Sequence, residues 1–225
     1  MPLFPQLSLG ISTEIIYSFV IIICSLMIYF GTKEIYDLSS YKGIKYFRLA
    51  FLFFGIAYLC RSFIELIVMS FNIHEILEIY PLITGYVALF AFMYLSSISI
   101  FYLIYSIAWK KWKDKSKMIY VFHAIAFLIA LASIIFNNKV FYIGLNVLLL
   151  ISAVIMVSIA SYNQQHALKK NNLLVIYLLL FVFFILNIFN ILVPIFLESL
   201  KLLIYLVSLG IFFVILYKVL KKSGD

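Results

Sequence analysis

Residues 48–71 read RLAFLFFGIAYLCRSFIELIVMSF, and this stretch decides the fold class. A helix rises 1.5 Å per residue, so about 20 apolar residues cross a hydrocarbon core about 30 Å thick. The stretch is longer than that and lacks the alternation of apolar and polar residues that is typical of a strand. It therefore predicts a transmembrane helix, with Arg61 and Glu65 as two charges inside it.

The whole chain has the same character. Hydrophobic residues make up 66% and charged residues 12% of its 225 residues, against about 45–50% and about 25% in soluble domains. The sequence predicts an all-α, multi-pass bundle of seven transmembrane helices that fills residues 1–225 as a single domain, with no soluble domain. The six other predicted spans are 14–31, 80–109, 118–136, 140–162, 173–197 and 200–220.

The basic residues predict the orientation of the bundle. Of the 17 Lys and Arg residues, all but Arg61, Lys139 and Lys201 fall in the odd-numbered connections or after the last span. Connections rich in Lys and Arg stay on the cytoplasmic side. We therefore expect the N-terminus outside, the C-terminus inside, and a multi-pass location in the plasma membrane.

Arg61 and Glu65 are four residues apart, so they share a helix face and can pair. In the predicted orientation both fall in the outer half of their span, Arg61 roughly 20 Å from its inner end. A central arginine costs about 2.5–3.5 kcal/mol on insertion scales, so we expect the pair to face the bundle interior or a wet cavity. The pair can equally be a purely structural link between helices.

Polar residues of other spans fall at a similar depth. If the helix faces that carry them converge, these residues line an outward-facing ligand pocket. Otherwise they form interhelical hydrogen bonds, each of which stabilises the bundle by about 0.6 kcal/mol. The candidate ligand-binding residues are Arg61, Glu65, Asn146, Asn187, Asn190 and Tyr205.

Two features are assigned to the inner side of the membrane. Aromatic and basic residues alternate in a motif that favours an anchor attracting the anionic lipids of the inner leaflet. The residues of this lipid-interface motif are Trp109, Lys110, Lys111, Trp112 and Lys113. His123 lies near the inner end of the fourth span, and we expect a packing residue there rather than a proton relay.

Several classes of function are excluded. The basic residues sit between apolar spans and not on a water-facing surface, which disfavours a nucleic acid partner. No catalytic residues and no metal site are predicted, because the chain lacks nucleophile–base, HExxH and CxxC spacings. Retinal needs a lysine in the middle of the last span, whereas Lys201 and Lys218 stand at its ends, and haem needs paired histidines. We expect no cofactor and no enzymatic activity.

Residues 45–63, KYFRLAFLFFGIAYLCRSF, resemble uncharacterised archaeal seven-helix membrane proteins and, more distantly, the seven-helix sensor regions of prokaryotic histidine kinases. The resemblance implies a sensor-like membrane module. The chain departs from the kinase pattern because no cytoplasmic domain follows the last span.

The leading hypothesis is a receptor- or sensor-like module with an outward-facing polar pocket, coupled to a separate membrane or cytoplasmic protein. A small-solute or ion permease is the first alternative, and an accessory subunit or scaffold of a membrane complex is the second. The sequence names neither a ligand nor an oligomeric state.

Overall fold

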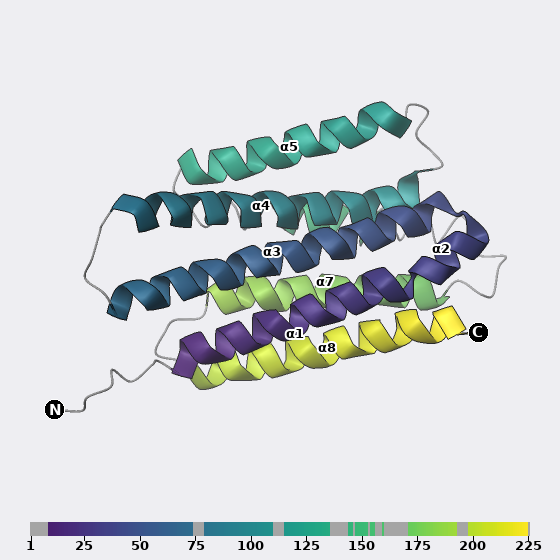
Figure 1. The fold of residues 1–225 in the computed structure, drawn as a ribbon. Helices are drawn as coiled ribbons and strands as arrows, with labels where there is room; N and C mark the ends of the chain where they lie inside the picture. The colour runs from purple at the N-terminus through teal and green to yellow at the C-terminus, as the bar shows by residue number, and fades with distance from the viewer. Residues whose placement is uncertain are drawn as a thin grey trace.

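The computed structural model describes residues 9–73, 79–109, 115–135, 144–145, 147–152, 154–155, 159, 171–192 and 198–224. These residues form seven helices and no strand. The helices lie side by side along one long axis (Figure 1). Their bounds are α1 (Leu9–Gly31), α2 (Lys33–Ser39), α3 (Lys42–Ile73), α4 (Ile79–Ala108), α5 (Lys115–Ile135), α7 (Asn171–Leu192) and α8 (Glu198–Gly224).

Five helical segments are long and apolar enough to cross a membrane, which indicates an integral membrane protein. They are Thr13–Ser39, which runs from α1 through α2, and Lys42–Ile64, Tyr86–Ile107, Lys117–Ile135 and Ser199–Lys221. The apolar part of α7, Val175–Leu186, is shorter. About half of the predicted span 140–162 lies outside the described residues, so seven spans and their orientation stay predictions.

The short helix α2 lies in a stretch that the sequence suggested was only a connection. The hydroxyl of Thr32 donates a hydrogen bond to the carbonyl oxygen of Ile28 at 2.7 Å, at the junction of α1 and α2. Ser40 ends α2 in the left-handed region, with φ 49°, and its N–H donates to Tyr36. The chain then enters α3, so α2 stands at one end of the bundle (Figure 1).

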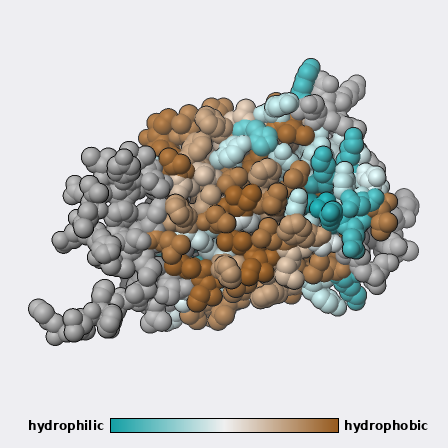
Figure 2. Space-filling model, in the orientation of Figure 1, coloured by the Kyte–Doolittle hydropathy of each residue, from teal (hydrophilic) through white to brown (hydrophobic). Residues whose placement is uncertain are grey.

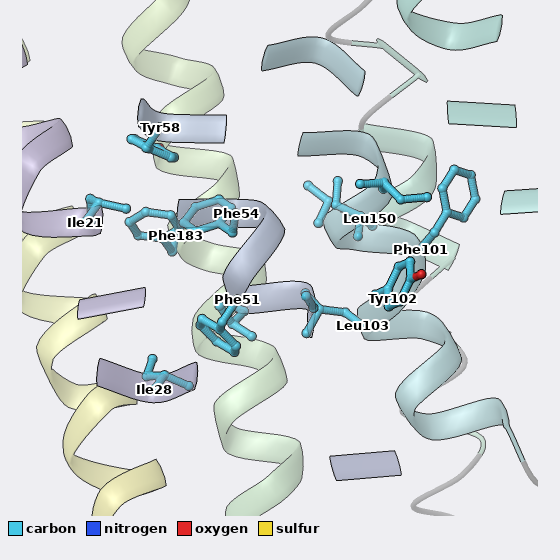
Figure 3. Packing of buried hydrophobic residues seen from close by; sticks show 14 of the residues in the cluster. Ile21, Ile28, Phe51, Phe54, Tyr58, Phe101, Tyr102, Leu103, Leu150 and Phe183 are labelled. Carbon is cyan, nitrogen blue, oxygen red and sulfur yellow. The ribbon is translucent and has the colours of Figure 1, made fainter. Parts of the chain in front are cut away.

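The core is built around α3, which packs against α1 and α4. Phe54 of α3 lies 5.7 Å from Phe183 of α7 and 6.0 Å from Phe212 of α8, measured between ring centroids. Figure 3 shows Phe54 beside Phe183, with Ile21 of α1 on the other side of Phe183. Aromatic pairs at such distances add to the stabilisation that burial itself provides.

Small residues let α3 approach its neighbours closely. A Cβ at Gly43 would lie 2.7 Å from the backbone oxygen of Ser106 in α4, and one at Gly55 would lie 3.3 Å from the Cβ of Ser25 in α1. In lipid, such small residues at helix interfaces increase van der Waals packing. Gly43 and Gly55 therefore fix the spacing of α1, α3 and α4.

The outer surface suits a bilayer. Hydrophobic residues form a band across the middle of the molecule, and hydrophilic residues gather at the end that carries α2 (Figure 2). Large apolar side chains point outward from several helices, which a soluble protein would avoid over so wide an area. Examples more than half exposed are Ile16, Phe19, Phe30, Leu128, Leu203 and Leu206.

Candidate functional site

The charged residue Arg61 pairs with a carboxylate of another helix. Its Nη2 donates to Oε1 of Glu14 in α1 at 2.8 Å. The hydroxyl of Tyr205 in α8 donates to the same oxygen at 2.7 Å. One carboxylate oxygen thus joins α1, α3 and α8; we call Glu14, Arg61 and Tyr205 the three-helix cluster.

Aromatic rings support this cluster from the core. Tyr17 lies 4.5 Å from Tyr205 and 6.0 Å from Tyr58 between ring centroids. The guanidinium carbon of Arg61 is 5.8 Å from the centre of the Tyr58 ring. The three tyrosines are buried, so they hold the charged groups in place without opening the core.

The helix directions explain why residues so distant in sequence meet. Arg61 contacts Glu14 near the start of α1, whereas Arg48 contacts Tyr29 near its end, so α1 and α3 are antiparallel. On the other side, the Tyr17 ring contacts that of Tyr205, and a Cβ at Gly31 would meet Leu220, so α1 and α8 run in the same direction.

The ion pair of Arg61 and Glu14 is only partly buried. The Arg61 side chain is 14% exposed and that of Glu14 is 28% exposed. A charge-assisted hydrogen bond lowers the cost of holding arginine among apolar helices. Arg61 and Tyr205 both donate to Oε1 of Glu14, and no donor among the described residues bonds Oε2.

Two of the residues predicted to line a pocket, Arg61 and Tyr205, meet here through Glu14. Arg61 bonds Glu14, and its pairing with Glu65, which the sequence suggested, stays a prediction. Asn146 and the side chains of Glu65, Asn187 and Asn190 lie outside the described residues. Convergence of the whole predicted set stays a prediction.

Glu14 is the site residue that sequence reasoning missed. It stands at the edge of the predicted span 14–31, where charged residues are ordinary and draw no attention. Its depth was the available signal: Glu14 lies roughly 25 Å from Gly31 along a helix, close to the depth assigned to Arg61. A carboxylate at the depth of an intramembrane arginine is a natural partner for it.

A second polar cluster lies nearer the α2 end. Nδ1 of His123 in α5 is 2.6 Å from the Tyr94 hydroxyl, and its Nε2 is 3.1 Å from the Tyr102 hydroxyl, both from α4. A neutral imidazole has one donor and one acceptor nitrogen, so one tyrosine accepts and the other donates. His123 is therefore a polar link between α4 and α5, beyond the simple packing role expected for it.

The lipid-interface motif is described only at its start. The indole of Trp109, which is partly buried, meets the Tyr41 ring edge-to-face at 5.3 Å. Trp109 thus packs beside the α2–α3 connection. Lys110, Lys111, Trp112 and Lys113 lie outside the described residues.

Two small apolar cavities lie between α4 and α7, and α3 also lines the first of them. One of about 10 Å³ borders Phe51 and Leu180, and another of about 20 Å³ borders Tyr177 and Leu150. Each volume suits at most one water, and neither cavity is lined by the three-helix cluster. Among the residues that the structure describes, no group of three or more His, Cys, Asp and Glu could hold a metal ion.

Comparison with known proteins finds a relative along nearly the full chain. A protein of Archaeoglobus fulgidus, described only as uncharacterized, is 32% identical over 219 residues, which cover 94% of this chain and 93% of that protein. No protein-family model matches the chain. No solved structure matches it. The resemblance to archaeal proteins thus extends well beyond residues 45–63, whereas these comparisons give no support to the resemblance to histidine-kinase sensor regions.

Proposed function

The chain belongs to the same family as the Archaeoglobus fulgidus protein, and we propose that it is a non-enzymatic, multi-pass plasma-membrane protein that acts as a sensor-like module. Its ligand is a small charged solute that binds at the three-helix cluster. The bundle end where α1 begins faces outside in this proposal. The response passes to a separate protein at the α2 end.

The exposed part of the ion pair carries this proposal. Apolar side chains can often replace a buried ion pair without loss of stability, so stability alone is a weak reason to keep one. The side chains of Glu14 and Arg61 are 28% and 14% exposed, which in this proposal lets a solute reach them. The second oxygen of Glu14 offers an acceptor for a donor group on the solute.

The course of α1 supports the coupling. A solute that competes for Glu14 weakens the contacts of α1 with α3 and α8 at one end of the helix. The other end of α1 continues through Thr32 into α2, whose Leu38 side chain is 89% exposed. A shift of α1 would therefore change a surface that a partner protein can contact.

The cluster of His123, Tyr94 and Tyr102 favours the permease as a second candidate. Together with the three-helix cluster, it places polar groups at two depths of the bundle. A permease would use both in turn and would open to each side. The accessory-subunit alternative instead predicts a stable complex and no solute at either cluster.

A solute screen tests the proposal. The purified protein is melted in detergent with inorganic ions, amines, carboxylates and amino acids, beside a Glu14→Gln variant and a Tyr120→Phe control. Tyr120 is 72% exposed on α5, away from the cluster. We expect one class of solute to raise the melting temperature of the wild type and the control but not of Glu14→Gln.

The outcomes separate the three candidates. Stabilisation without transport of the same solute into proteoliposomes supports the sensor, and transport supports the permease. If no solute distinguishes wild type from Glu14→Gln, the three-helix cluster is a structural link and the sensor proposal fails.

A further inference from the structure

Arg48 is a buried charge at the end of the bundle opposite the three-helix cluster. It lies about 9 Å along α3 from Lys42, and it is 9% exposed. Its Nε donates to the backbone carbonyl of Tyr29 in α1 at 3.0 Å. Its guanidinium carbon is 4.8 Å from the centre of the Tyr29 ring and 5.8 Å from that of Tyr36 in α2.

These contacts include no anionic partner for Arg48. Among the described residues, no carboxylate pairs with Arg48, and the ion pair that they form joins Arg61 to Glu14. A guanidinium has five N–H donors, and the carbonyl of Tyr29 takes the one on Nε. Buried charges are normally paired, so the terminal amino groups of Arg48 call for an anion.

The surroundings indicate which anion fits. Lys45 precedes Arg48 by one turn of α3, and Lys33 precedes Tyr36 by one turn of α2; both lysines are exposed. The hydrophilic surface at this end adjoins the apolar band (Figure 2), and lipid headgroups lie at such a boundary when an apolar band spans a bilayer. A planar guanidinium matches a phosphate with two parallel hydrogen bonds.

We propose that Arg48, held between Tyr29 and Tyr36, binds the phosphate of an anionic phospholipid at the α2 end of the bundle. The lipid phosphate supplies the missing counter-charge, and Lys33 and Lys45 add positive potential around it. The lipid thereby stabilises the junction of α1, α2 and α3. This site is independent of the solute proposed at the three-helix cluster.

A purely structural role for Arg48 makes a different prediction. A cation near the last turn of a helix stabilises its free carbonyls, and Arg48 does this for Tyr29 close to the end of α1. Loss of that cap lowers the melting temperature equally with and without lipid. Loss of a lipid site instead removes the increase that lipid produces.

The experiment compares these increases. Delipidated protein in dodecyl maltoside is titrated with dioleoyl phosphatidylglycerol, dioleoyl phosphatidylcholine or inorganic phosphate, and the melting temperature is recorded. The variants are Arg48→Gln and Arg48→Lys, with Lys42→Gln as the control that removes an exposed charge from the same helix. Native mass spectrometry counts the bound lipid.

We expect phosphatidylglycerol to stabilise the wild type and Lys42→Gln, and phosphatidylcholine to do so much less. Arg48→Gln should bind phosphatidylglycerol about tenfold more weakly, the loss of one charge-assisted contact. Arg48→Lys, which keeps the charge and is the readout if Arg48→Gln does not fold, should bind with intermediate strength. Full lipid stabilisation in the Arg48 variants overturns the proposal, as does equal stabilisation by inorganic phosphate at the same concentration.

Discussion

Arg61 of α3 donates to the carboxylate of Glu14, 47 residues earlier in the chain, across 2.8 Å. This bond joins the start of α1 to α3, while the bond from Arg48 to Tyr29 joins the end of α1 to the same helix. Two arginines of α3 therefore hold α1 at both ends. Tyr205 adds α8 to the first of these contacts.

The first prediction concerns the partner of Arg61. In a double-mutant cycle, Arg61→Gln and Glu14→Gln should show a coupling energy of about 1–2 kcal/mol, within the range of directly bonded pairs. Arg61→Gln and Lys42→Gln, whose positions lie far apart along α3, should be additive within about 0.5 kcal/mol. Chemical unfolding in detergent gives both values, and a coupling between Arg61 and Glu14 no larger than that between Arg61 and Lys42 would contradict the observed pairing.

The second prediction concerns His123. Replacement by Phe leaves the hydroxyls of Tyr94 and Tyr102 without their shared partner and should destabilise the protein by about 1–3 kcal/mol. The triple variant that also carries Tyr94→Phe and Tyr102→Phe removes both orphaned hydroxyls and should recover most of the loss. Melting curves of the two variants test this, and equal losses would show that the hydrogen bonds are not the cause.

The third prediction uses two glycines as a matched pair. A Cβ at Gly43 would press on the backbone of Ser106, so Gly43→Ala should force α3 away from α4 and destabilise by about 1–3 kcal/mol. Nothing lies within 4 Å of a Cβ at Gly210 in α8. Gly210→Ala should be neutral or stabilising by up to about 1 kcal/mol, because alanine favours helix. The opposite order of melting temperatures would refute this packing.

The fourth prediction concerns orientation. A cysteine introduced at Leu38, which is 89% exposed on α2, should react with a membrane-impermeant maleimide only after the cells are permeabilised. Cys24 and Cys60 are free thiols, so a variant with both replaced by alanine is the background. Labelling of intact cells would place α2 outside and reverse the predicted topology.

The general fold could be predicted from the sequence because long apolar runs have few stable structures in lipid. The lengths of the apolar runs predicted six of the helices, and most of the helix ends lie within a few residues of the predicted ones. These helices are α1, α3, α4, α5, α7 and α8. Apolar length missed α2, because a short helix with Lys33, Glu34 and Asp37 has no apolar run. Its end depends on the backbone geometry of Ser40, which composition does not reveal.

The site was harder to predict, because it depends on rotation about the helix axes. Sequence distance made Glu65 the natural partner of Arg61, one helical turn away. The structure brings Glu14 to Arg61 through the antiparallel packing of α1 on α3, which no local pattern encodes. The common level of Arg61 and Tyr205 along the bundle was readable from the sequence, whereas the direction in which each side chain points was not.

The most direct test of the central claim is the melting temperature of a variant that removes the whole three-helix cluster: Glu14→Leu, Arg61→Leu and Tyr205→Phe. No member of the cluster then remains charged or unpaired, so any change reports what the cluster itself contributes. Functional sites commonly hold polar groups at the expense of stability, and we predict that the triple variant melts at the wild-type temperature or above it. A melting temperature several degrees lower would mean that the cluster exists to hold the helices together, and it would contradict the proposed sensing site.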